Sequence, residues 1–527
     1  MKNKILIILL IMTMAATQAA FIGKAQSIEE TGNMQMKPAP SKKEIKALEK
    51  KLKAEEKAEK ERIKCAKKQE KKVEQDVKMT QTHFVDKKQA EQFGNVVDNV
   101  IKQENISPTK SDAKVVEGYV QETFILSLDD CIAKALQTNP IIRSAFSNSE
   151  IDKTKIGQAW SKYLPTFSMT NGATRNRFLT INFPVPQQYY TFYNAIDAST
   201  TQLIFDFGKT KAKADASKKV YEASVATLNE TINNTIYNVK EAYYQLLYSM
   251  EKQNVYLDAI DAYSLQYKQA SAFYTIGTKP KIDVVNAEYN LGNARLGYIK
   301  ASNETQIAYA KLNNAMGIPK EVDYKLLDKL KVQDYVCDFD FLARAAFESR
   351  PELESFRKKA LASKLNVRYS KRAFYPDIEF VGQIQAGGGT SFTDDYGFKV
   401  GAQMAYKTTN FYLLKKQVDE AKATYQRDLA DLAVEENDLY LEVREAYINL
   451  KNAKESVPVS ALAVKKAEEQ YKLASGRYKA GVGDAIEFKD AENTYRSARL
   501  DYLNALVNYN VSAASLEKVI GSKLVAK

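Results

Sequence analysis

The stretch "SGRYKAGVGDAIEFKDAE", Ser475–Glu492, contains a turn that the chain builds a second time. Its counterpart is "SAFYTIGTKPKIDVVNAE", Ser271–Glu288. In both stretches a Tyr is followed by a Gly three residues on, then by an acidic residue six after the Gly, then by Ala-Glu. A glycine at such a point favours a tight reversal or the end of a helix. We therefore expect two equivalent turns between helices.

The repetition extends over most of the chain. The segment "TNPIIRSAFSNSEIDKTKIGQAWSKYLP", Thr138–Pro165, aligns with "SRPELESFRKKALASKLNVRYSKRAFYP", Ser349–Pro376. Further on, "EAYYQLL" at Glu241 aligns with "EAYINLK" at Glu445. A unit of about 200 residues is far longer than a solenoid repeat of 20–50 residues. The sequence therefore predicts a duplicated large unit, with copies at 122–317 and 337–522, a linker at 318–336 and a tail at 523–527.

Each copy has the pattern of a helix, a pair of strands, a very long helix, a turn and a returning helix. The helical pattern from Lys209 to Ile276 corresponds to about 100 Å at 1.5 Å per residue. Apolar residues form a heptad seam along it, broken only by Gln253: Ile232, Ile236, Val239, Tyr243, Leu246, Met250, Leu257 and Ile260. The returning helix is half as long, so we expect the helix ending near Leu164 to stack end to end with it. Pro458 should kink or break the second long helix.

The predicted strands lie between these helices. In the second copy, five residues alternate with polar or small ones and are expected to face lipid: Phe398, Val400, Ala402, Met404 and Tyr406. Lys399 and Gln403 are expected to face the lumen. Alternation over about ten residues is typical of membrane barrel strands. Aromatic residues cluster where strands meet helices and indicate an interfacial girdle, with ordinary core aromatics of a half-buried sandwich as the alternative. The first copy has a weaker pair, near 166–176 and 190–205. Four strands cannot close a barrel, whereas three chains would supply twelve.

The N-terminal part of the chain differs from the rest in composition. Residues 1–25 read as a cleaved secretory signal, with a basic start and a short apolar run. Residues 26–121 form a Lys/Glu-rich extension, with 15 Lys and Arg against 9 Asp and Glu in Ser41–Thr80. Its apolar stripe is thin, so we expect a partly helical or disordered, dispensable extension. A basic arm that touches anionic lipid, cell wall or a partner is the alternative; nucleic acid is not expected.

Residues for enzymatic chemistry are scarce. The chain has one histidine, His83, and no CxxC, HExxH, GxSxG or P-loop pattern. We therefore expect no enzyme activity, no cofactor and no metal site. The three cysteines, Cys65, Cys131 and Cys337, form no disulfide framework. A Cys131–Cys337 disulfide stays open, and free buried thiols are favoured.

The order and spacing of several motifs over about Thr123–Ser522 resemble the TolC-like outer-membrane efflux channel family (outer membrane factors). The motifs are "LSLDDCIAKALQTNP", "KYLPTFSMT", "QLIFDFGKTKAKA", "YTIGTKPKIDVVNAE", "YPDIEFVGQI" and "YKAGVGDAIEFKDAE". The chain departs from the family in its long extension and in "YKTTNF", which stands where a second "FDFG" would be. The resemblance implies a mainly α fold with a membrane β-barrel. It further implies a homotrimer in a Gram-negative outer membrane, with a long periplasmic tunnel that receives substrate from an inner-membrane pump through a periplasmic adaptor. A structural or adhesive trimeric coiled-coil protein is the alternative.

The resemblance also implies roles for the two turns at the periplasmic mouth. Six turn residues are expected to contact the adaptor: Gly277, Thr278, Lys279, Gly481, Val482 and Gly483. In the family, a Tyr and an Arg of the second turn bind an Asp of the first; these positions fall on Tyr478, Gly483 and Asp283. The Arg is thus absent, and Lys279 or Lys281 stays open as its substitute. The family's acidic rings fall on Glu487 and Asp490, which implies cation selectivity; ordinary solvated carboxylates are the alternative. Cargo and pump class stay open.

Overall fold

The computed structural model describes residues 87–104, 106, 124–180, 187–319, 324–335, 338–388, 395–406 and 410–524. The proposed signal and residues 26–86 lie outside this set, as do Cys65 and Cys337. Residues Ala90–Lys527 form one compact unit, and it is the one described below. None of the helices in the described part is both long enough and apolar enough to cross a membrane.

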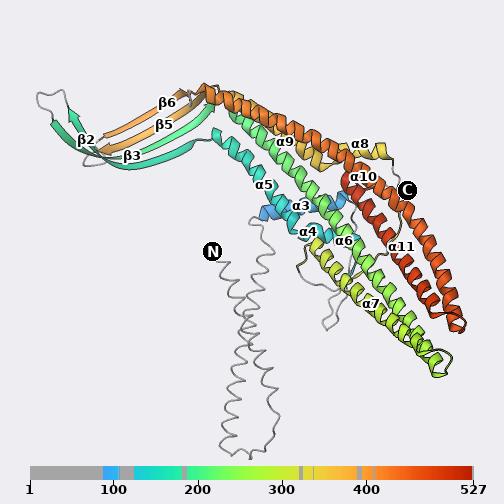
Figure 1. Cartoon of the computed structure of the whole chain (residues 1–527). Helices are drawn as coiled ribbons and strands as arrows, with labels where there is room; N and C mark the ends of the chain where they lie inside the picture. The colour runs from blue at the N-terminus through green and yellow to red at the C-terminus, as the bar shows by residue number, and fades with distance from the viewer. Residues whose placement is uncertain are drawn as a thin grey trace, which may run out of the picture. The chain divides into compact units, whose positions relative to one another are not determined.

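The described elements repeat one plan twice, as Figure 1 shows. The first copy consists of α4 (Leu128–Thr138), α5 (Pro140–Trp160), the short η1 (Ser161–Tyr163), β2 (Thr166–Thr180), β3 (Gln187–Phe205), α6 (Lys209–Thr275) and α7 (Lys281–Met316). The second copy consists of α8 (Phe339–Ser349), α9 (Pro351–Arg372), β5 (Asp377–Gly388), β6 (Asp395–Ala405), α10 (Phe411–Lys479) and α11 (Ala485–Ile520). The predicted succession of elements is confirmed in both copies.

The two helices that precede the strands meet at an Asn-Pro pair in the first copy (α4 and α5) and at an Arg-Pro pair in the second (α8 and α9). Asn139 ends α4, and its side chain accepts a hydrogen bond from the Ile141 N–H at 2.9 Å, which caps α5. Pro140 then occupies the first position of α5, where a missing N–H costs nothing. Pro351 has the same position in α9.

The returning helix packs along only half of each long helix. The other half is covered by α5 in the first copy and by α9 in the second. The ends meet where α7 finishes: Thr138 Oγ1 donates to the Met316 carbonyl at 2.6 Å, and Asn139 Nδ2 to the Ala315 carbonyl at 2.9 Å. Gly317 has φ +74°, and a Cβ there would lie 2.7 Å from Asn139 Cα. The expected end-to-end stacking is confirmed, and glycine is the residue that permits it.

Two expectations about the long helices are wrong. The heptad seam ends near Met250: Leu257 is 46% exposed, whereas Val255 and Ala259 are buried. Smaller side chains are buried in this part of α6 instead, because α6 packs against both α7 and α11. Pro458 does not break α10, which runs unbroken from Phe411 to Lys479, so of the expected kink or break the break is wrong. The packing of this helix, with Val457 buried in the core of the second copy, offsets the lost hydrogen bond.

The four long strands form one antiparallel sheet in the order β2-β3-β5-β6. The pairing places Met169 beside Ala198, Ala198 beside Ile384, and Ile384 beside Phe398. Residues that face one another across strands share a face, so an apolar face runs across all four strands. The other face is polar: the Ser168 and Ser199 hydroxyls are hydrogen-bonded at 2.7 Å, and Gln383 donates to Asp197.

Two features near the start of the first copy were not expected. A short β1 (Phe124–Leu126) pairs in parallel with β4 (Tyr324–Leu326), inside the expected linker. The helix α3 (Lys87–Gln103) lies within the expected extension, yet Phe93 and Val97 are buried. The Phe93 ring meets the Phe146 ring of α5 edge-on at 5.3 Å. The expectation of a dispensable extension is therefore wrong where α3 packs on α5, since Phe93 and Val97 are core residues.

Candidate functional site

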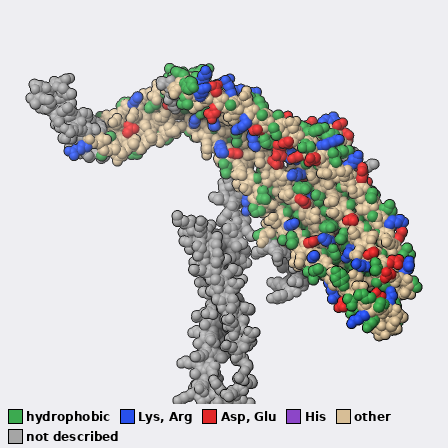
Figure 2. Space-filling model, in the orientation of Figure 1, with side chains coloured by type: hydrophobic (Ala, Val, Ile, Leu, Met, Phe, Trp, Pro, Cys, Tyr) green, Lys and Arg blue, Asp and Glu red, His purple; other side chains and the backbone are tan. Residues whose placement is uncertain are grey.

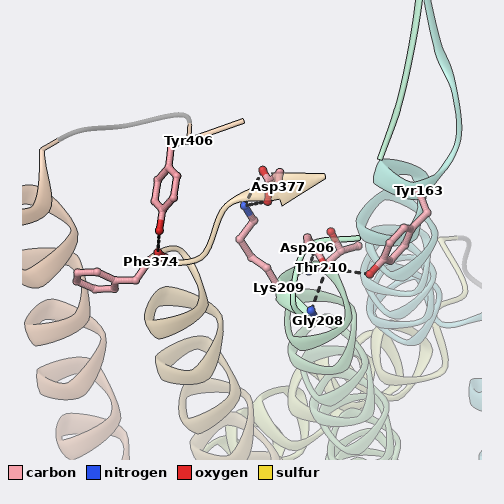
Figure 3. Close-up of polar contacts among 8 residues, drawn as sticks. All are labelled: Tyr163, Asp206, Gly208, Lys209, Thr210, Phe374, Asp377 and Tyr406. Carbon is pink, nitrogen blue, oxygen red and sulfur yellow. Dashed lines mark hydrogen bonds and ion pairs between the residues drawn. The ribbon is translucent and has the colours of Figure 1, made fainter. Parts of the chain in front are cut away.

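The strand-to-helix junction is the first candidate site, and Figure 3 shows its polar contacts. Asp206 is 1% exposed in the motif "FDFG". Its carboxylate accepts from the Thr210 N–H at 2.6 Å, the Gly208 N–H at 3.0 Å and the Tyr163 hydroxyl at 2.9 Å. Burial by itself would raise the pKa of Asp206, but these hydrogen bonds outweigh it and lower the pKa. The ionised carboxylate thus caps the start of α6.

The junction also joins the two copies of the repeat. Lys209 Nζ lies 2.6 Å from a carboxylate oxygen of Asp377, which begins β5. The Arg372 guanidinium donates to the Gly208 carbonyl. Phe207 and Gly208 have φ +53° and +76°, which turn the chain from strand to helix within two residues. The sequence showed "FDFG" as unmatched in the second copy but gave it no role; there, Asn410 caps α10 through the Leu413 N–H instead.

Aromatic side chains surround this junction. Phe207 lies 4.9 Å from Phe205 and 5.1 Å from Tyr375, measured between ring centroids. The Tyr406 hydroxyl donates to the Phe374 carbonyl at 3.0 Å. Figure 2 shows hydrophobic and basic side chains gathered where strands give way to helices. Such a mixture is typical of a membrane interface.

The apolar face of the sheet is exposed in the single chain. Its residues Phe398, Val400 and Met404 are 84%, 69% and 71% exposed. A groove of about 690 Å³ on this face is lined by side chains of all four strands. Ala402 shares the face, and Tyr406, 53% exposed, follows the end of β6. Lys399 and Gln403 lie on the opposite face, beside Gln383 and Glu379. The alternation predicted for this strand is thus confirmed.

The second candidate site is the pair of hairpin tips, where the two turns have the same backbone hydrogen bonds. The Gly277 N–H donates to the Tyr274 carbonyl at 3.0 Å, and the Gly481 N–H to the Tyr478 carbonyl at 3.1 Å. Both glycines have positive φ, +75° and +77°. The next two N–H groups of each turn share one carbonyl: Thr278 and Lys279 donate to Phe273, and Val482 and Gly483 to Arg477. The expected equivalence of the turns is confirmed.

The tips contact one another through Lys279. Its Nζ donates to the Gly483 carbonyl at 3.3 Å and lies 5.3 Å from the centroid of the Tyr478 ring. A Cβ on Gly483 would lie 2.7 Å from the Tyr478 backbone nitrogen. No larger side chain fits at Gly483 without a backbone shift, so the cation comes from the other tip.

Tyr478 is a core residue of the tip junction. It is 1% exposed, and its ring lies 5.5 Å from the Phe488 ring. Its hydroxyl has no hydrogen-bond partner among the described residues, so none joins it to Asp283. Burial raises the pKa of Tyr478, and the charges of Asp283 and Asp484 add to this. The Gln266 amide acts the other way, although its geometry falls short of a hydrogen bond.

The expected acidic residues lie on the first turns of α11. Glu487 pairs with Arg477 of the same hairpin at 3.4 Å, and both side chains are well exposed. Asp490 is exposed, one turn further on. Arg477 was not singled out in the sequence because it aligns with Phe273 in the first turn. In the ranges that the structure describes, no group of three or more acidic, His or Cys side chains could hold a metal ion.

Cys131 lies away from both sites, in α4. It is a free, buried thiol. Burial, with Asp130 and Asp328 nearby, raises the pKa of Cys131 to about 12, so the thiol stays protonated.

The profile of the outer membrane efflux protein family matches residues 131–318 and 342–522. The chain belongs to the outer membrane efflux protein family. This family consists of channel-forming proteins of the outer membrane, not of enzymes, and the expected resemblance is confirmed. The chain is 21% identical over 430 residues to the probable efflux pump outer membrane protein TtgC of Pseudomonas putida, and the match covers 79% of this chain and 87% of the relative. It is 21% identical over 412 residues to the outer membrane protein TolC of Escherichia coli, covering 74% and 81%.

Solved structures agree on the fold. The outer membrane channel CmeC of Campylobacter jejuni superposes on the efflux protein with a TM-score of 0.66 and 18% identity, covering 75% of this chain and 85% of that one. The residues outside the family match include the whole N-terminal extension.

Proposed function

We propose that three copies of the chain form the exit duct of an efflux or type I secretion system in a Gram-negative outer membrane. The observation that carries this is a four-stranded sheet with one exposed apolar face and open edges, continuous with two long helical hairpins. Open edges are not tolerated in lipid, so further strands must come from other copies. Three chains give a barrel of twelve strands, above the minimum of eight.

In this assembly the apolar face, with Phe398, Val400, Ala402, Met404 and Tyr406, contacts lipid. The polar face lines the lumen. The helical hairpins continue the duct into the periplasm, where an adaptor and an inner-membrane pump deliver the substrate. The tips, Gly277–Lys279 and Gly481–Gly483, contact the adaptor because they are the ends of both hairpins, where Gly277, Thr278, Gly481 and Val482 are exposed. Cysteine pairs engineered across this contact should crosslink in cells.

The gate of this duct uses a lysine in place of the missing arginine. Lys279 bonds to the opposite tip through the Gly483 carbonyl and the Tyr478 ring. Asp283 lies in the first turn of α7, on the same tip as Lys279. We assign Lys279 the closing contact, with Asp283 and Tyr478 beside it. A single cation–carbonyl contact holds less tightly than a bidentate arginine pair, so the closed state is a weak one.

Glu487 and Asp490 give the mouth its cation selectivity. Three copies around one axis would concentrate their negative charge. Because Arg477 neutralises part of the charge of Glu487, Asp490 contributes the larger share. Lower cation selectivity in the double variant Glu487→Ala, Asp490→Ala, seen as a shifted reversal potential, supports this assignment; an unchanged potential contradicts it.

The chain divisions follow from the same function. Residues 1–25 direct export and are removed, 122–317 and 337–522 build the duct, and 318–336 connect them. Residues 523–527 form a short tail. The extension is dispensable only as far as its part before Ala90, since Phe93 packs on α5.

The experiment that tests the function combines heat-stable trimers in outer-membrane fractions with single-channel conductance in planar bilayers. A structural or adhesive coiled-coil protein would form trimers without conducting.

A further inference from the structure

A carboxylate is buried between the two hairpins, away from the tips. Glu492 of α11 is 4% exposed. Its Oε2 accepts a hydrogen bond of 2.5 Å from the hydroxyl of Tyr263, which is 3% exposed and belongs to α6 in the other hairpin. This hydrogen bond therefore ties one hairpin to the other inside a single chain.

The rest of the site offers the charge little compensation. Arg496, one turn along α11, has Nη2 at 4.0 Å from Glu492 Oε2. The Arg496 guanidinium also donates to Asn493 and lies 5.6 Å from the Tyr256 ring. Burying a carboxylate that has one hydrogen bond and one cation outside hydrogen-bond distance costs more desolvation free energy than these two interactions give back. Burial accordingly raises the pKa of Glu492, although Tyr263 and Arg496 act against it.

The groups around the pair come from all four helices of the two hairpins. Tyr263 and Asp258 belong to α6, Tyr471 to α10, and Arg496 and Arg499 to α11; Arg499 pairs with Asp258 at 2.7 Å. The α7 helix contributes the apolar Leu291 and Ala294 to the adjoining cluster. On the tip side of the pair lie Tyr478 and Phe488, so the carboxylate sits next to the contact that holds the tips together.

The equivalent carboxylate in the first copy of the repeat is not buried. The Ala-Glu pair occurs in both copies, but Glu288, the counterpart of Glu492, is exposed. The counterpart of Tyr263 is the buried Ala467, which has no hydroxyl to donate. The hydrogen bond between Tyr263 and Glu492 thus has no counterpart at the equivalent positions, Ala467 of α10 and Glu288 of α7.

We propose that Glu492, held by Tyr263, is a positioning residue that keeps the seam between the hairpins weak enough to part when the tips open. The inference rests on the proposed channel function. The ionised carboxylate opposes packing of the seam, so its protonation or its replacement by an amide tightens the seam. Because packing raises its pKa, the seam is tightest below the pKa of the unburied group and loosens as pH rises through the raised pKa. Tyr263, whose own pKa is raised by burial and by Glu492, remains the donor throughout.

The test is single-channel recording at pH 4.5 to 8 with three purified variants. Glu492→Gln keeps the shape and the acceptor but removes the charge, so its open probability should fall several-fold at pH 8 and lose its dependence on acid. Tyr263→Phe leaves the carboxylate without its donor, so the open probability should rise. The matched control, Glu288→Gln, changes the exposed counterpart and should behave as the unmodified protein.

Hydrogen exchange of the α6 and α11 amides around the seam gives a second readout that does not need a current. Slower exchange in Glu492→Gln and faster exchange in Tyr263→Phe support the inference. Exchange and gating in Glu492→Gln that match those of Glu288→Gln overturn it. If the unmodified protein conducts and gates but the variants do not differ, only the seam inference fails. If the folded unmodified protein passes no current, the proposed function itself fails.

Discussion

Individual residues in this protein hold the transitions between elements rather than a reaction centre. Asp206 fixes the step from strand to helix by accepting three hydrogen bonds. Gly277 and Gly481 fix the hairpin turns through their positive φ. Lys279 joins the tips by donating to the carbonyl of Gly483, a residue with no room for a side chain. The sequence indicated the glycines, since both occur in one repeated motif, but a buried carboxylate such as Asp206 looks like any surface acid until its partners are known.

A pH-dependent contribution to stability is expected from Asp206. Its pKa is lowered in the fold, so the ionised form stabilises the protein above the pKa of an unfolded Asp, about 3.9. This stabilisation is lost as pH falls through the lowered pKa. Asp206→Asn should therefore lower the melting temperature at pH 7 by the equivalent of about 2 kcal/mol, with a smaller difference below about pH 4. Asp215→Asn, further along the chain and inside α6, is the control. A difference that stays constant with pH would contradict the assignment.

The tip contact of Lys279 should control leakage through the closed mouth. Lys279→Met keeps most of the apolar stem but removes the charge that bonds to the Gly483 carbonyl, so closed-state current should rise. Lys281→Met, two residues away at the start of α7, removes the same charge without that contact and serves as the control. Bilayer recordings measure the closed-state current of both variants. Equal currents would show that Lys279 does not hold the tips together.

At the scale of elements, the sequence predicted types and order well, and contacts less well. Period-two alternation predicted β5 and β6, and long helical periodicity predicted α6 and α10. The heptad seam was wrong beyond Met250, because which face of a helix is buried depends on how many helices surround it. The pair β1–β4 was missed because three-residue strands carry no detectable period. The expected break at Pro458 was wrong because packing along α10 outweighs one missing hydrogen bond.

The two faces of the sheet should respond differently to charge. Val400 and Gln403 are both exposed in the single chain, so only the surroundings of the sheet can separate them. If Val400 faces lipid, Val400→Arg should cost about 2–4 kcal/mol near the midplane. Gln403→Arg, on the polar face of the same strand, should cost much less. Urea titration of folding into vesicles measures both, and equal costs would place the strand outside lipid or in another register.

The N-terminal extension should divide functionally near Ala90. Deleting 26–86 should leave trimers and conductance intact. Phe93→Ala should destabilise the protein by about 3 kcal/mol, because a buried phenyl ring is lost from the contact with Phe146. Thermal unfolding of both variants checks this. Loss of trimers on deletion of 26–86 would show that this segment packs in the assembly.

At the scale of the whole molecule, the duplication accounts for both the sheet and the tips. Each copy supplies two strands of the larger sheet and one hairpin, so one chain presents a four-stranded sheet and two tips. The sheet edges at β2 and β6 lack neighbouring strands in the part of the chain that the structure describes, and in the proposed trimer each would pair with the next chain. The repeat is visible in the sequence and predicted this architecture. The exact side-chain contacts across the repeat, such as Lys209 with Asp377, could not be predicted because they join distant segments.

Single-channel recording of the purified protein in planar bilayers tests the central claim most directly. The proposed duct predicts discrete, long-lived current steps from heat-stable trimers, with a reversal potential that indicates cation selectivity. Folded trimers that insert into the bilayer but produce no current steps would contradict it.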